Sequence, residues 1–205
     1  FKDVYLWSMV ADAKGIKMSK SKGNVINPIE LVEKYGADAL RMSLLYGTPA
    51  GSKVILAEEK VRGMRNFGNK IWNSARYVIG KRSNSQFSVS LRDSSNSNEF
   101  SKDSIFKNKL NQVIKEVSKH LEDLRLNAAA EVAYDEFWHW FCDEAVESNK
   151  KQEVSDKMLL HGLIIFLKLL HPFMPFVTEA VWQELRQQRL VEEELLMLSP
   201  WPKIS

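Results

Sequence analysis

The sequence has very little of what several protein classes require. Cys142 is the only cysteine in 205 residues, which excludes an internal disulfide and any zinc site built on several thiolates, so we expect no metal site and a cytoplasmic protein. No apolar run is long enough to cross a membrane, because the longest, from Met158 to Leu170, contains His161 and Lys168. The chain begins with Phe1 rather than methionine, and we therefore expect a fragment of a longer protein.

Negative charge is scarce in the first part of the chain. Residues 1–82 contain 15 lysines and arginines against 7 acidic residues, whereas residues 83–205 contain 14 against 19. A basic first part and an acidic second part indicate that a polyanion, if the chain binds one, contacts mainly the first part. The alternative is that charge varies along the chain without functional meaning.

Glycine and proline are also few, 9 and 6, and they separate segments of helical periodicity. Asn27 followed by Pro28 and Glu30 is a helix start with asparagine as the N-cap, and Gly36 ends that helix. The sequence predicts a mainly α protein, with a small α/β piece at 1–56 and an antiparallel helical bundle at 57–205. We expect a strand at about 4–10 followed by a short hairpin, helices at about 57–82, 104–124 (with Ile105 and Leu110 inward), 127–148, 155–171 and 176–189, and a flexible serine- and asparagine-rich loop at about 83–101.

One stretch near the start is a candidate site. Lys17-Met18-Ser19-Lys20-Ser21 is followed directly by Lys22, Gly23 and Asn24. Lysines supply compact positive charge, and serine hydroxyls with backbone N–H groups supply hydrogen bonds, so the stretch suits a mobile loop that binds phosphates. The alternative is a solvated basic loop without a function.

A second candidate is a polar stripe on the helix expected over residues 57–82. Its members are arginines and asparagines at the 3.6-residue period, with no carboxylate among them. Such a face forms hydrogen bonds to a sugar-phosphate backbone without repelling it. Periodicity alone favours the alternative, a solvated face whose amides bridge neighbouring segments. The stripe consists of Arg62, Asn66, Asn69, Asn73 and Arg76.

The string Lys-Met-Ser-Lys-Ser resembles the signature of class I aminoacyl-tRNA synthetases. Further blocks resemble the valyl-tRNA synthetase family and occur in the same order. Some of them are shared with the isoleucyl and leucyl members, whereas Thr48–Gly51 and the three blocks between Arg65 and Arg76 resemble the valyl members specifically. The blocks outside the signature loop are Phe1–Tyr5, Tyr35–Arg41, Thr48–Gly51, Arg65–Phe67, Asn69–Lys70, Trp72–Arg76, Phe137–Asp143, His171–Phe176 and Pro200–Pro202.

The resemblance implies that the two parts of the chain belong to different domains with different functions. Residues 1–56 would be the end of a Rossmann catalytic domain with the signature loop and a stem-contact segment, and residues 57–205 would be the anticodon-binding domain. The full-length enzyme would be a monomer that activates valine with ATP and Mg²⁺ and transfers it to tRNA(Val). This fragment lacks the H-I-G-H motif and the amino-acid pocket, and we expect it to be inactive alone. Lys17 and Lys20 would be catalytic, and Lys17, Met18, Ser19, Lys20 and Ser21 would bind ATP.

Two alternatives stay open within this interpretation. One is a fragment of an isoleucyl- or leucyl-tRNA synthetase, which shares the signature loop and the block from Tyr35 to Arg41. The other is a non-catalytic tRNA-binding module, which would have no use for an ATP-phosphate loop. The resemblance also favours tRNA as the partner of the polar stripe, so the predicted tRNA-binding residues are Arg62, Asn66, Asn69, Asn73 and Arg76.

Overall fold

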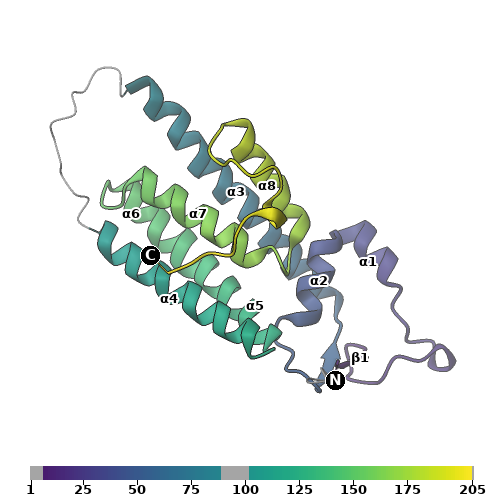
Figure 1. Cartoon of the computed structure of the whole chain (residues 1–205). Coiled ribbons are helices and arrows are strands. Elements are labelled where there is room, and N and C mark those ends of the chain that lie inside the picture. Colours follow the sequence, from purple (N-terminus) through teal and green to yellow (C-terminus); the bar gives the residue numbers. More distant parts are fainter. Residues whose placement is uncertain (1–6, 89–101, 205) are drawn as a thin grey trace.

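A helix of 31 residues, α3 (Glu58–Ser88), is the longest element in this computed structural model, which describes residues 7–88 and 102–204. It packs against α2 (Ala37–Leu45), α7 (Asp156–Leu170) and α8 (Pro175–Gln187), and Figure 1 shows it running along the bundle. One side of α3 is buried, with side chains no more than 6% exposed. They are Val61, Met64, Phe67, Ile71, Ala75 and Val78. Five of them lie where the helical period predicts an apolar side, whereas Phe67 is buried in place of the expected Gly68.

The other bundle helices complete a mainly α fold, as predicted. A short turn joins α4 to a continuous helical stretch made of α5, η3 and α6, and α7 and α8 follow after further turns (Figure 1). No helix in the described part of the chain is long and apolar enough to cross a membrane. The bounds are α4 (Asp103–Glu122), α5 (Leu126–Asp135), η3 (Glu136–Ala145), α6 (Val146–Lys150) and a final short turn η4 (Leu196–Leu198).

A small α/β unit precedes the bundle. Strand β1 (Met9–Ala11) pairs in parallel with β2 (Lys53–Ile55). Residues 4–6 of the strand predicted at about 4–10 lie outside the described residues, and residues 7 and 8 are not part of β1. The predicted hairpin is reduced to a single antiparallel bridge between Ala11 and Lys17, and β1 pairs along its whole length with β2, some 40 residues further along the chain.

Helix α1 (Pro28–Tyr35) begins and ends where the sequence predicted. The Asn27 Oδ1 atom accepts the Ile29 N–H at 3.0 Å, which caps the first turn. Glu30 reaches back to the Asn27 side-chain amide at 3.0 Å. Gly36 ends the helix at φ 88°, a conformation that glycine adopts without the strain a Cβ would bring.

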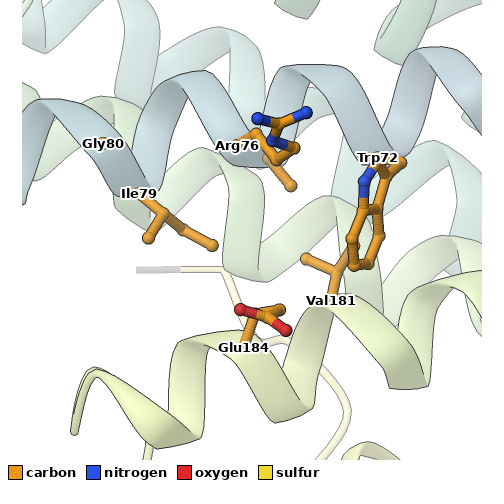
Figure 2. Close-up of a pocket in the computed structure, with 7 residues that line it drawn as sticks. Trp72, Arg76, Ile79, Gly80, Val181 and Glu184 are labelled. Carbon is orange, nitrogen blue, oxygen red and sulfur yellow. The ribbon is translucent and has the colours of Figure 1, made fainter.

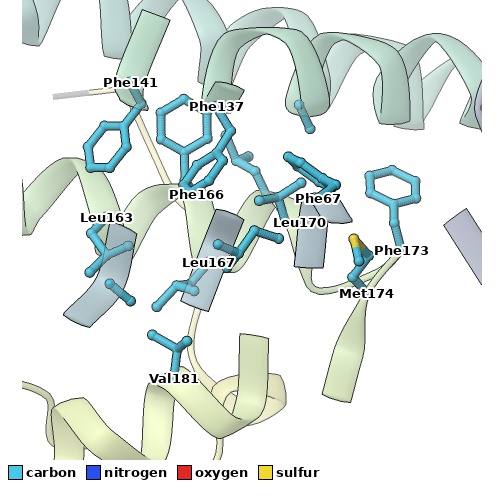
Figure 3. Close-up of a cluster of buried hydrophobic side chains, with 14 of the residues drawn as sticks. Phe67, Phe137, Phe141, Leu163, Phe166, Leu167, Leu170, Phe173, Met174 and Val181 are labelled. Atoms are coloured by element: carbon cyan, nitrogen blue, oxygen red, sulfur yellow. The ribbon is translucent and has the colours of Figure 1, made fainter. Parts of the chain in front are cut away.

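Aromatic side chains from three helices meet in the middle of the bundle (Figure 3). Phe137 of η3 lies 5.9 Å from the ring of Phe67 on α3 and 5.4 Å from that of Phe166 on α7, edge to face in both pairs. All three side chains are fully buried. Because edge-to-face pairs add to the free energy of burial, this cluster joins α3, η3 and α7 into one core.

Three sequence predictions about the bundle need correction. The helix α3 continues through residues 83–88, which were expected to begin a flexible loop, because Ser83 to Gln86 include no glycine or proline to end it; residues 89–101 lie outside the described part. Ile105 is 63% exposed, and its neighbour Phe106 is buried in its place. The helix predicted at 127–148 is π-helical over Glu136–Ala145, which a 3.6-residue period does not reveal.

Gly162 in α7 tests the packing of the core. An added Cβ would lie 2.6 Å from Phe106 Cζ and 2.9 Å from Phe141 Cε2. We expect Gly162→Ala to lower the free energy of unfolding by about 1–3 kcal/mol, measured by urea denaturation, although alanine favours a helix. Gly63→Ala in α3 is the control, because its Cβ would meet nothing within 4 Å; it should raise stability by about 0.5–1 kcal/mol. Equal stabilisation by both changes would contradict the packing described here.

Candidate functional site

The signature loop, residues 17–24, follows a tight turn after β1. The Asp12 carboxylate accepts the N–H groups of Lys14 and Ile16 at 3.0 and 2.9 Å, and this forms the turn. The loop then makes one short helical turn, η1 (Lys20–Lys22), which Gly23 ends at φ 67°. In Figure 1 the segment between β1 and α1 extends away from the helical bundle.

Asn24 ties the two ends of the signature loop together. Its Oδ1 atom accepts the Ser19 N–H at 2.9 Å, and its Nδ2 atom donates to Asp12 Oδ2 at 2.8 Å and to the Lys17 carbonyl at 3.3 Å. The hydrogen bond from Asn24 is the main cause that lowers the pKa of the Asp12 carboxyl below its ordinary value, and the bond from the Ile16 N–H is the next largest. This group therefore stays ionised at neutral pH. Sequence reasoning gave Asn24 and Asp12 no role in the site, because their contact joins positions 12 residues apart that no motif pairs.

The loop leaves its cations available. Lys17 and Lys20 are exposed, and within the described residues neither side chain forms an ion pair or a hydrogen bond. Ser19 and Ser21 share a hydroxyl–hydroxyl bond of 2.8 Å, and Met18 is half-buried. Free ammonium groups beside hydroxyl groups suit the charge and the acceptor oxygens of a polyphosphate, so the residues present fit the phosphates of ATP.

The polar stripe on α3 is where the sequence placed it. Opposite the buried side of the helix, all five of its side chains are exposed. Arg65 adds another exposed cation beside it, since its Nη2 atom donates to Asn66 Oδ1 at 3.2 Å. Lys70 turns instead toward the bundle, where it forms an ion pair with Asp143 at 3.0 Å. The stripe is therefore a surface of guanidinium and amide groups, and its members are Arg62, Asn66, Asn69, Asn73 and Arg76.

A pocket of about 260 Å³ opens beside the stripe, between α3 and α8 (Figure 2). Trp72 and Arg76 enter it from α3, and Glu184 and Val181 enter it from α8. An indole, a guanidinium and a carboxylate around one cavity offer a stacking surface together with donors and acceptors. Trp72 lies one helical turn before Arg76, a signal that the sequence contained, whereas nothing in the sequence linked Glu184 to either of them.

The structure brings the stripe and the pocket together but keeps both apart from the signature loop. Arg76 belongs to the stripe and also lines the pocket. In Figure 1 the segment between β1 and α1, which carries the signature loop, extends away from the bundle, whereas α3, which carries the stripe, belongs to the bundle. Across residues 7–88 and 102–204 there is no group of three histidine, cysteine or acidic side chains able to hold a metal ion. The chain thus presents two separate polar surfaces, each suited to phosphates.

Comparisons with known proteins assign families to both parts of the chain. Residues 1–57 match the family model of tRNA synthetases class I (I, L, M and V), and residues 103–205 match that of the anticodon-binding domain of tRNA ligase. A LeuRS from Agrobacterium radiobacter, solved in a ternary complex with tRNA, superposes with a TM-score of 0.77 at 25% identity, over 97% of this chain and 23% of that one.

Curated relatives agree with these models. Valine–tRNA ligase from Clostridium tetani is 38% identical over 99% of this chain, and that from Pelagibacter ubique is 40% identical over 98%. The chain spans about a quarter of their length, 23% and 24% respectively. With both family models in the order that the signature loop and the bundle predict, the chain belongs to the class I tRNA synthetases that carry the anticodon-binding domain of tRNA ligases.

Proposed function

We propose that this chain is the part of a valine–tRNA ligase that joins the ATP-phosphate loop to the tRNA-binding bundle. The observation that carries the proposal is the signature loop, whose Lys17 and Lys20 are exposed and have no partner among the described residues, on a segment that continues into an anticodon-binding domain. The similarity to valine–tRNA ligases over nearly the whole chain favours valine as the amino acid over leucine or isoleucine. The phosphate loop itself argues against a module that only binds tRNA.

In this proposal the loop acts while the amino acid is activated. The valine carboxylate attacks the α-phosphorus of ATP, the bond to the β-phosphate oxygen breaks, and pyrophosphate leaves with the electron pair. Charge develops on the leaving phosphates, and Mg²⁺ bound with ATP would neutralise part of it. Lys20 and Lys17 stabilise the remainder, and the hydroxyls of Ser19 and Ser21 donate to phosphate oxygens.

The bundle supports the second part of the proposal, which is binding of tRNA(Val). The stripe offers donors to a sugar-phosphate backbone, and no carboxylate lies within it to repel one. The pocket beside Arg76 is lined by Trp72 and Glu184 and suits a single unstacked base, which proteins hold by aromatic stacking and by hydrogen bonds to the base edge. Backbone contacts and base contacts would then lie side by side on one face of α3.

Replacing Lys20 tests the role of the loop. In the full-length ligase, we expect Lys20→Ala to slow valine-dependent ATP–pyrophosphate exchange by about 100-fold or more, because one cation is removed from the developing charge. The affinity for tRNA(Val), measured by filter binding, should stay within about twofold. Lys157→Ala removes an equally exposed lysine from α7 and should change neither measurement. Unchanged exchange in Lys20→Ala would show that the loop has no catalytic role.

Salt dependence tests the role of the stripe. We expect the full-length ligase to bind tRNA(Val) more weakly as salt rises, because binding phosphates releases counterions. Arg62→Ala should lower the slope of log K against log [salt] by about 1, as expected for the loss of one phosphate contact. Lys157→Ala has the same charge change outside the stripe and should leave the slope unchanged. Binding that does not depend on salt, or equal slopes in both variants, would exclude the stripe as the tRNA surface.

A further inference from the structure

The carboxylate of Asp38 holds the first turn of α8 from a distant part of the chain. Its Oδ1 atom accepts the Phe176 N–H at 3.1 Å, and its Oδ2 atom accepts the Val177 N–H at 2.7 Å. The first turn of a helix has N–H groups without helical partners, and the residue at the N-cap position, Met174, has no side-chain acceptor to offer them. Asp38, at the start of α2 and 138 residues before Phe176, supplies the cap instead.

Further contacts hold α2 against the bundle at both of its ends. Beside Asp38, the Arg41 Nη2 atom donates to the Pro172 carbonyl at 3.1 Å, in the turn that leads to α8. Beyond the far end of α2, the Gly47 N–H donates to Glu131 Oε1 on α5 at 3.0 Å. The adjoining tyrosine rings, Tyr46 and Tyr134, lie 4.8 Å apart. Because α2 follows α1 through Gly36 alone, these contacts help to orient the segment that carries the signature loop, together with the bond from the Tyr35 hydroxyl on α1 to Glu58 on α3 at 2.6 Å.

Burying the carboxylate of Asp38 costs desolvation free energy, so stability alone does not account for this residue. The residue is 9% exposed, and desolvation raises the pKa of its carboxyl against the opposing effects of the two N–H donors and of Arg41. Apolar contacts already hold α2, since Ala39 and Met42 are buried. What the buried carboxylate contributes is a fixed orientation of α8 relative to α2, because it accepts two hydrogen bonds from adjacent N–H groups of α8.

We propose that Asp38 is a positioning residue for the transfer of the amino acid to tRNA. The inference rests on the proposed function, in which the bundle holds tRNA while the signature loop helps to form the adenylate. Transfer requires that the tRNA terminus reach the site where the adenylate forms, so it depends on how the bundle is oriented relative to the loop segment. Adenylate formation does not use the bundle. Losing the bonds from Asp38 therefore impairs transfer more than activation.

The test compares the two half-reactions in the full-length ligase. We expect Asp38→Ala to lower kcat/KM for charging tRNA(Val) by about tenfold or more, while valine-dependent ATP–pyrophosphate exchange changes by less than about twofold. Asp38→Asn keeps one acceptor oxygen and nearly the same volume, and it should give a smaller fall in charging of the same kind. If the alanine variant does not fold, the asparagine variant decides.

Asp103→Ala is the matched control. Asp103 also binds the start of a helix through its carboxylate, accepting the Ser155 N–H at 2.8 Å and the Ser155 hydroxyl at 2.7 Å. Asp103 joins α4 to α7 within the bundle. Its loss should lower the thermal midpoint of unfolding, while any effect on ATP–pyrophosphate exchange and on tRNA charging should be equal. Equal losses of exchange and charging in the Asp38 variants, or no loss of either, would overturn the inference. A wild-type ligase that neither exchanges nor charges with valine would overturn the proposed function itself, and this is seen before any variant is made.

Discussion

Burial of one face of α3 is the constraint on which the rest of the structure depends. Phe67, at the centre of that face, is fully buried and packs against the rings of Tyr134 and Phe137, while other residues of the same face contact α2, α7 and α8. An amphipathic helix buries its apolar face in the core and presents its polar face to solvent, as α3 does. The arginines and asparagines of the stripe occupy that exposed face. The packing of the bundle and the placement of its proposed tRNA surface therefore have the same cause.

The two polar surfaces use different means of holding their side chains in place. The stripe needs only a rigid helix, because its side chains project from consecutive turns of α3. The signature loop has little core beneath it, so hydrogen bonds replace packing: Asn24 joins Ser19, Lys17 and Asp12 without using a lysine ammonium group. Between the two surfaces, α2 is bonded to the bundle by Asp38 and Arg41, and the turn after α2 is bonded to it by Gly47. The loop proposed to contact a nucleotide and the bundle proposed to contact tRNA are thus connected through α2.

Local patterns predicted the parts of this structure that depend on local physics. The cap at Asn27, the end of α1 at Gly36 and the exposed stripe of α3 all follow from short-range rules on capping and periodicity. Ile105 was placed wrongly, because adjacent apolar residues in one helix leave a choice that the neighbouring helices decide. The parallel pairing of β1 with β2, the cap that Asp38 provides for α8 and the contribution of Glu184 to the pocket join positions far apart. No pattern within one stretch of sequence specifies such partners.

The most direct test of the account is photo-cross-linking between α3 and tRNA. A photoreactive side chain in place of Asn69, in the middle of the stripe, would be irradiated in the full-length ligase with bound tRNA(Val). The account predicts cross-links from position 69 to tRNA(Val), and none when the same group replaces Lys157 on α7. No cross-links from position 69 while tRNA remains bound, or equal cross-links from position 157, would contradict the assignment of the exposed face of α3 to tRNA.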